Sequence, residues 1–170
     1  RAAPAARKAN RVFVVEGYMD VIALAQTGVA EAVAPLGTAL TEHQLERLWR
    51  MVDVPTLCFD GDGAGQKAAM RAFAEDQRFY AQTFVAVEKS GMDPCELRLA
   101  RGPEAVRALV DARQPLFEFV IRTTLASFDL STAEGRVGAL RAAAPAVASI
   151  RDSALKPEYT RMLAGWLGMD

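Results

Sequence analysis

The chain has 170 residues, an apolar fraction of 51%, a charged fraction of 24% and a formal net charge of −1. These values are typical of a soluble globular protein with one domain and room for a helical appendage. They exclude a strongly basic nucleic-acid-binding protein, and no apolar stretch is long enough to span a bilayer, so no membrane partner is expected. Two cysteines without Cys-x-x-Cys spacing and a single histidine predict no zinc site.

Residues 1–10 are rich in alanine and basic side chains and contain no apolar core segment. We expect a flexible, basic end here, not a secretory signal, and therefore a cytoplasmic, reducing setting. Arg7 and Lys8 of this stretch, and Arg11 directly after it, are candidates for contact with nucleic acid.

Residues 11–113 alternate short apolar runs with segments of helical periodicity, which predicts a doubly wound α/β domain with a mostly parallel sheet. Thr41 followed by Gln44 is a capping box, and Asp93-Pro94 is a helix start with a capping side chain. The expected strands are 11–15, 30–34, 56–59 and 83–87. The expected helices are 20–27, 41–51 and 66–80, a helix that opens at Asp93-Pro94, and 103–112.

Residues 114–170 show only helical patterns, so we expect an all-helical subdomain without further strands. Ser131-Thr132-Ala133-Glu134 is a second capping sequence, and Lys156-Pro157 introduces the last helix. The expected helices are 116–128, 132–150 and 156–166.

Acidic residues follow the predicted strands at three points of the chain. Glu16 ends the run Val14-Val15-Glu16, Asp60 and Asp62 follow the run ending at Phe59, and Asp93 follows the last strand. Carboxylates gathered at one sheet edge repel each other, and Mg²⁺, which prefers oxygen ligands, would remove that repulsion. The alternative is a solvated strand end for Glu16, a plain turn at Asp60-Gly61 and a helix cap for Asp93.

The order and spacing of these motifs resemble the Toprim domain of bacterial replicative DNA primases of the DnaG type, a Rossmann-like fold. The resemblance rests on Glu-Gly-Tyr-Met-Asp at 16–20, Leu-Gly-Thr at 36–38, Asp-Gly-Asp at 60–62 followed by Gly-Ala-Gly, and Asp-Pro at 93–94. The helical tail is similar to the segment that follows Toprim in the RNA-polymerase domain of these primases. Cys95 departs from the family pattern, which has a further aspartate there, so the number of bound ions is open.

The resemblance implies template-directed synthesis of RNA primers by Mg²⁺-dependent nucleotidyl transfer, with Mn²⁺ as a substitute for Mg²⁺. It implies catalytic and metal-binding roles for the acidic residues, supporting roles for their neighbours, and a phosphate contact from the helix after Gly65. The catalytic residues are Glu16, Asp60 and Asp62; the metal ligands add Asp93; the supporting residues are Asp20, Gly37, Thr38, Gly61 and Gly65; the phosphate contact is Lys67.

The partners implied are a single-stranded DNA template, nucleoside triphosphates, an RNA primer and the replicative helicase. The resemblance places the helicase contact in a domain outside this chain, and the location in a nucleoid-associated replisome of a bacterial cytoplasm. It also implies that a basic subdomain on the N-terminal side, which helps to hold the template, lies outside the chain, so we expect weak primer synthesis from these residues by themselves.

Other proteins with Toprim domains are alternatives. A topoisomerase needs a catalytic tyrosine on a separate domain, and Tyr18, Tyr80 and Tyr159 have no such context. A Toprim nuclease would degrade DNA without a covalent adduct, and a recombination mediator would carry a zinc motif. A phage-type primase–helicase differs chiefly by a fused motor domain.

Overall fold

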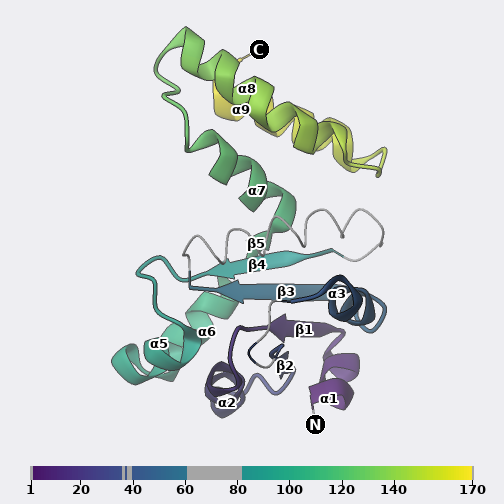
Figure 1. Cartoon of the computed structure of the whole chain (residues 1–170), viewed down its shortest axis with the longest axis vertical. Helices are drawn as coiled ribbons and strands as arrows, with labels where there is room; N and C mark the ends of the chain where they lie inside the picture. Colours follow the sequence, from purple (N-terminus) through teal and green to yellow (C-terminus); the bar gives the residue numbers. More distant parts are fainter. Residues whose placement is uncertain (1, 36, 38–39, 61–81, 170) are drawn as a thin grey trace. The chain divides into compact units, whose positions relative to one another are not determined.

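The computed structural model describes residues 2–35, 37, 40–60 and 82–169 (Figure 1). By its internal contacts the chain divides into residues 1–116 and residues 117–170. None of the described helices is long and apolar enough to cross a membrane. The helix expected at 66–80 lies outside the described residues.

The first unit contains a five-stranded sheet of order β2-β1-β3-β4-β5. The first four strands of this order run parallel to one another, and β5 pairs with β4 in the antiparallel direction. The strands are β1 (Arg11–Val14), β2 (Ala32–Val33), β3 (Val54–Phe59), β4 (Phe84–Val87) and β5 (Gln114–Pro115). The mostly parallel sheet confirms the predicted fold class, whereas β5 contradicts the expectation that no strand follows β4.

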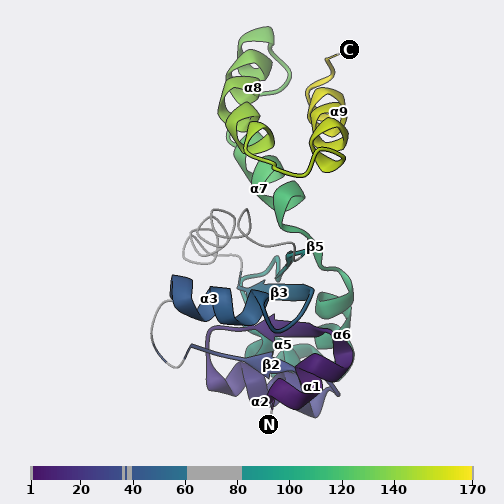
Figure 2. The same cartoon turned by 90° about the vertical axis from the view of Figure 1, so that its right-hand side faces the viewer.

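Helices cover both faces of this sheet, as a doubly wound fold requires. Figure 2 shows α3 and α6 on opposite sides of the sheet. The helices that the structure describes in the first unit are α1 (Ala2–Ala9), α2 (Tyr18–Gln26), α3 (Glu42–Trp49), α5 (Pro94–Arg101) and α6 (Pro103–Asp111).

Successive residues of β1 point to opposite faces, so they belong to two different apolar clusters. Phe13 and Val15 pack with Leu24 of α2, Leu97 of α5 and residues of α6 on one face. On the other face, Val12 packs with α1 and with the end of α3. Both faces of the central strand are therefore buried, which explains its uninterrupted apolar sequence.

The expectation of a flexible end at residues 1–10 differs from the structure, which forms helix α1 there. Ala6 is fully buried in the cluster that contains Val12 and Val52. Pro4 does not interrupt the helix because it lies in the first turn, where its missing N–H has no partner within the helix.

Cys58 lies in β3 and is buried, as its place in an apolar run predicts. Burial, together with the charge of Asp20, raises the pKa of its thiol to about 12. The thiol therefore stays protonated at neutral pH and packs as a small apolar group.

The second unit contains α8 (Ala133–Ala148), α9 (Leu155–Leu167) and all but the first residue of α7 (Leu116–Leu125). The Thr132 side chain accepts a hydrogen bond from the N–H of Gly135 at 3.0 Å, which confirms the predicted helix start. Its core joins Ile121 and Leu125 to residues of α8 and α9.

Candidate metal centre

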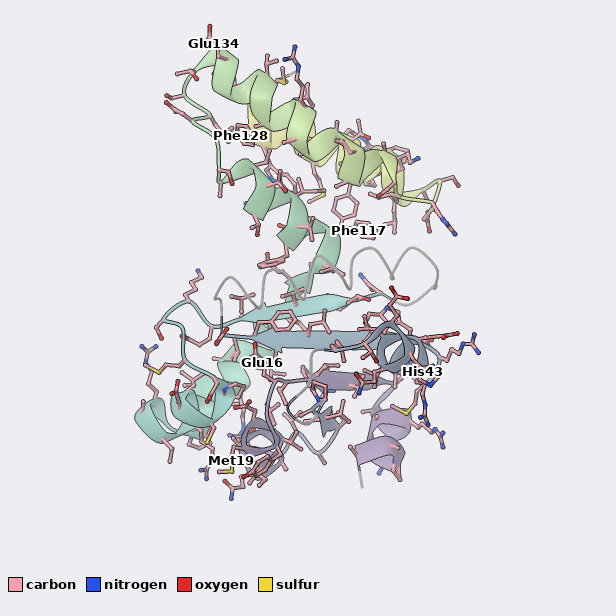
Figure 3. All side chains as sticks on the ribbon, in the orientation of Figure 1. Glu16, Met19, His43, Phe117, Phe128 and Glu134 are labelled. Atoms are coloured by element: carbon pink, nitrogen blue, oxygen red, sulfur yellow. The ribbon has the colours of Figure 1, made fainter. Side chains whose placement is uncertain are left out.

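The acidic residues of the first unit follow three neighbouring parallel strands. Val14 pairs with Leu57, and Phe59 pairs with Val87, so β1, β3 and β4 end at the same edge of the sheet. Glu16 lies two residues beyond the end of β1, and Asp60 directly follows β3. Figure 3 labels Glu16 at this edge. The parallel topology thus places both carboxylates on one side of the domain, as the sequence predicts.

The loop after β4 approaches the same edge. A Cβ atom built on Gly91 would lie 3.8 Å from the carbonyl oxygen of Asp60, so this loop contacts the end of β3. Gly91 has a φ of 80°, a conformation that side chains other than glycine rarely adopt. Asp93 follows two residues later at the start of α5.

Asp93 caps α5. Its carboxylate accepts a hydrogen bond from the N–H of Glu96 at 2.7 Å, and the Glu96 carboxylate accepts one from the N–H of Asp93 at 3.3 Å. The side chain is half-buried. The capping alternative for Asp93 is therefore realised, while its role as a metal ligand stays a prediction.

Asp20 joins the starts of α2 and α5. It is only 4% exposed and accepts hydrogen bonds from the N–H of Gly17 at 3.1 Å and from the N–H of Cys95 at 3.2 Å. Burial raises the pKa of this carboxyl, and the nearby negative charge of Asp93 raises it further, while the two N–H donors act in the opposite direction. Asp20 therefore fixes the residue after Glu16 relative to the residues after Asp93, which supports a positioning role beside the strand ends.

Glu88 organises the loop after β4, a role that our sequence analysis missed. Its Oε2 accepts hydrogen bonds from the N–H of Ser90 at 2.7 Å, the hydroxyl of Ser90 at 2.6 Å and the N–H of Met92 at 3.1 Å. Burial by itself would raise the pKa of Glu88, but these donors and the guanidinium of Arg101 outweigh it and hold the pKa below its ordinary value. The sequence signal was available: an acidic residue two positions before a serine, in a turn that ends at Gly91.

Replacing Glu88 with glutamine is expected to lower the free energy of unfolding by about 1.5 kcal/mol at neutral pH, because a charged acceptor of three hydrogen bonds is lost. A carboxyl whose pKa is lower in the folded state stabilises the protein above its unfolded-state pKa, and this contribution disappears as the pH falls through the folded-state pKa. Urea unfolding of the wild type and Glu88→Gln at neutral and acidic pH measures the difference in the free energy of unfolding. This difference should shrink when the pH falls below 4.5, the ordinary pKa of a glutamate side chain.

Glu104→Gln is the matched control, because the Glu104 side chain is 78% exposed and its ion pair with Arg107 contributes little. A stability difference for Glu88→Gln that is independent of pH would contradict the assigned role of the Glu88 charge.

The remaining predicted residues separate into two groups. Gly37 has a φ of 77°, which fits the tight turn expected there. Asp62, Gly61, Gly65, Lys67 and Thr38 lie outside the described residues.

The basic residues near the N-terminus do not share one environment. Arg7 and Lys8 are exposed on α1. Arg11 donates a hydrogen bond to the buried Glu31 at 2.7 Å and stacks over the ring of Phe13. It lies at the opposite end of β1 from Glu16, so its observed contacts are structural.

The donor set at the strand ends fits a hard divalent cation, because carboxylate oxygens are the ligands that Mg²⁺ prefers. Among the residues that the structure describes, no three His, Cys, Asp or Glu side chains are grouped closely enough to hold a metal ion. Glu16 and Asp60 are among the described residues, whereas Asp62, the other predicted ligand of the Asp-Gly-Asp motif, lies outside them.

Two family models match the chain. Residues 10–87 match the Toprim domain, and residues 117–170 match the DnaB-helicase binding domain of primase. The second match differs from our expectation that the helicase contact lies in a domain outside the chain.

Curated relatives are named DNA primase. The protein of Mycolicibacterium smegmatis is 50% identical over 170 residues, which are 96% of this chain and 27% of the relative. The protein of Pseudomonas aeruginosa is 41% identical over 162 residues, which are 89% of this chain and 24% of the relative. The chain thus spans about a quarter of the length of these relatives.

Solved structures agree with these relatives. The RNA polymerase domain of Mycobacterium tuberculosis primase DnaG in complex with double-stranded DNA has a TM-score of 0.88 and 47% identity, with 99% of this chain and 55% of that chain covered. A DNA primase domain from Pseudomonas aeruginosa has a TM-score of 0.77 and 38% identity, with 94% of this chain and 51% of that chain covered. Strand topology, family models and relatives all agree, and the chain belongs to the bacterial DnaG-type primases, of which it contains the Toprim domain and the helical segment that follows.

Proposed function

We propose that this chain supplies the metal-binding part of a primase that synthesises short RNA primers on a single-stranded DNA template from nucleoside triphosphates. The observation that carries the proposal is the position of Glu16 and Asp60 beyond the carboxyl ends of two adjacent parallel strands. The comparisons favour this function over a topoisomerase, a nuclease or a phage-type primase–helicase, because the relatives are named DNA primase across nearly the whole chain.

In this proposal Glu16 and Asp60 hold the cation, with Asp62 and Asp93 as further ligands. The bound Mg²⁺ would lower the pKa of an attacking hydroxyl and stabilise charge on the phosphoryl oxygens. Asp20 keeps the start of α2 close to the start of α5, and Glu88 holds the loop that carries Asp93. The protein's own contribution is therefore mainly positioning of charge at a fixed sheet edge.

Calorimetric titration with Mn²⁺ tests the proposal. We expect the wild-type chain to bind Mn²⁺ and the variant Glu16→Gln/Asp60→Asn to bind it at least about 100-fold more weakly, because even residues behind the direct ligands commonly account for 10–100-fold in metal affinity. The variant Asp111→Asn/Glu134→Gln removes the same number of charges from exposed helical positions and should bind as the wild type does.

Equal Mn²⁺ affinity in the wild type and in Glu16→Gln/Asp60→Asn would refute the site. The site is also refuted if neither protein binds Mn²⁺, because the proposal assigns a metal site to the 170-residue chain without further protein segments or nucleotide.

The match of residues 117–170 supports a replicative helicase as partner of the second unit. The same residues are also covered by structures of the RNA polymerase domain of related primases. Gel filtration of the chain with the replicative helicase separates these two assignments: co-elution supports a helicase contact in this unit, and separate elution assigns the unit to the polymerase domain alone.

A further inference from the structure

The turn after β4 places two groups of opposite charge against the hydroxyl of one exposed serine. Ser90 Oγ donates a hydrogen bond to Oε2 of Glu88 at 2.6 Å. Arg101, in the last turn of α5, reaches back to the same serine, and its Nη2 donates to Oγ at 3.4 Å. The Ser90 hydroxyl therefore joins a carboxylate of the turn to a guanidinium of the helix that follows it.

The Glu88 carboxylate is the acceptor on which this turn depends. The same Oε2 accepts hydrogen bonds from the N–H of Ser90 at 2.7 Å and the N–H of Met92 at 3.1 Å. The Glu88 side chain is only 9% exposed. Met92 directly precedes Asp93, which caps α5 and is a predicted metal ligand. A change that pulls Glu88 out of the turn would therefore release the segment that leads to Asp93.

Arg101 is placed to receive a phosphate group at Ser90. Its Nη1 lies 3.9 Å from Oε1 of Glu88 and its side chain is 53% exposed, so the present ion pair is weak and can be exchanged for a stronger one. Lys89 adds a second exposed cation next to Ser90. A phosphate on a serine carries a charge of about −1.5 to −2 at neutral pH, and guanidinium groups bind it with strong hydrogen bonds.

We propose that Ser90 is a phosphorylation site, and that its phosphate detaches Glu88 from the turn and binds the Arg101 guanidinium instead. A serine kinase supplies the reaction: the Ser90 oxygen attacks the γ-phosphorus of ATP, the bond to ADP breaks, and the hydroxyl proton passes to the base of the kinase. The product has no O–H to donate to Glu88. Two anions then face each other where a hydrogen bond of 2.6 Å stood.

The consequence of this modification is regulation of the candidate metal centre, because the loop that carries Asp93 exists in a fixed and a released form. This consequence rests on the proposed function. The release itself takes place in the chain without metal and can be measured there.

Hydrogen exchange followed by NMR measures the release in EDTA, with phosphoserine incorporated at position 90 of the 170-residue chain through an expanded genetic code. We expect the protection factor of the Met92 N–H to fall at least about tenfold, because its charged acceptor moves away. The fall should be smaller at about pH 5 than at pH 7, since the phosphate takes up its second proton with a pKa of about 6. Ser90→Ala removes the hydroxyl without adding charge, and should reduce the protection less than the phosphate does.

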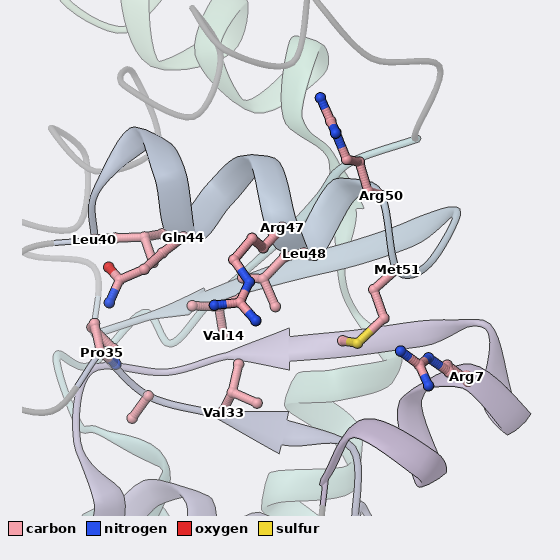
Figure 4. A pocket seen from close by; sticks show the side chains of 11 residues that line it. Arg7, Val14, Val33, Pro35, Leu40, Gln44, Arg47, Leu48, Arg50 and Met51 are labelled. Atoms are coloured by element: carbon pink, nitrogen blue, oxygen red, sulfur yellow. The ribbon is translucent and has the colours of Figure 1, made fainter.

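Phosphoserine at position 153 is the matched control, because Ser153 is exposed in the second unit and the added charge is the same. It should leave the protection of the Met92 N–H unchanged. The phosphate partner is tested by ³¹P NMR titration of the chain with phosphoserine at position 90. Arg101→Gln should raise the pKa of the phosphate, because a cation beside it is lost. Arg47→Gln should not, since Arg47 is an exposed arginine of the same unit that lines a groove between α1 and α3 (Figure 4).

A broad-specificity serine kinase with ATP should modify Ser90 in the unmodified chain, and mass spectrometry of the peptides identifies the position. The proposal is overturned if Ser90 stays unmodified, if phosphoserine there leaves the Met92 N–H as protected as in the wild type, or if phosphoserine at position 153 lowers that protection as much. It is also overturned if Arg101→Gln and Arg47→Gln leave the phosphate with the same pKa.

None of these measurements uses Mn²⁺. A failed switch therefore leaves the titration of the Glu16 and Asp60 site standing, and a failure of Mn²⁺ binding leaves the exchange result at the turn standing.

Discussion

Replacing Phe13 with alanine is expected to lower the free energy of unfolding of the first unit by about 4 kcal/mol, the usual cost of truncating a buried phenylalanine. Phe13 is fully buried in β1, where it pairs with Ala32 on one side and Thr56 on the other. Its ring belongs to the cluster that holds α2, α5 and α6 on the sheet. Because the surrounding strands are fixed by their hydrogen bonds, the cavity cannot fully collapse.

Urea unfolding followed by tryptophan fluorescence measures this loss, since Trp49 is buried in the first unit. Leu99→Ala is the matched control, because Leu99 of α5 is 77% exposed and should change stability by less than about 0.5 kcal/mol. A loss below about 1 kcal/mol for Phe13→Ala would show that β1 does not form the centre of the core.

Replacing Gly135 with alanine is expected to destabilise the second unit by about 3 kcal/mol. An added Cβ atom would overlap the carbonyl oxygen of Asp129 and lie 2.7 Å from the hydroxyl oxygen of Thr132. Thr132 caps α8, and Asp129 accepts two hydrogen bonds from Ser131 in the turn before it. The methyl group can fit only if this turn moves off the first residues of the helix, which breaks the cap.

Gly165→Ala in α9 tests the same substitution where space is available, because nothing lies within 4 Å of its Cβ position. Alanine has the higher helix propensity, so this variant should gain up to about 1 kcal/mol. Thermal unfolding of the chain with each substitution shows whether Gly135→Ala lowers the stability and Gly165→Ala raises it. A gain of similar size at both positions would mean that helix propensity, not the turn at Asp129, governs the response.

The elements that sequence reasoning predicted correctly are those determined by local chemistry. Thr41, Asp93 and Thr132 accept the backbone hydrogen bonds expected of helix caps, and each is recognisable within four residues of sequence. The apolar runs that form β1 and β3 are equally local signals. Their parallel order then follows from the alternation of strands and helices, and it brings Glu16 and Asp60 to one edge.

The features that were missed depend on contacts between distant residues. β5 has only two residues and contains a proline, so nothing in its sequence indicates a strand until Gln114 is placed against Val85. The sequence predicts a flexible end where α1 forms, because Ala6, the buried residue of this helix, is buried by packing with Val52, which is distant in the sequence. The bridge from Asp20 to the N–H of Cys95 spans 75 residues and could not be inferred from either motif separately.

The short outer strands have a consequence for how this domain behaves at high concentration. An exposed sheet edge offers unpaired N–H and C=O groups to a second molecule, and long, flat edges promote association between chains. Here β2 and β5, the two edge strands that the structure describes, have two residues each, and Pro115 of β5 has no N–H to donate. The longest strand, β3, is paired on both sides by β1 and β4, and β5 covers Phe84 and Val85 of β4, so the edge strands themselves offer little template for strand addition between copies. Protection of this kind is valuable to a parallel sheet, which has to form its long-range pairings before these strands are covered.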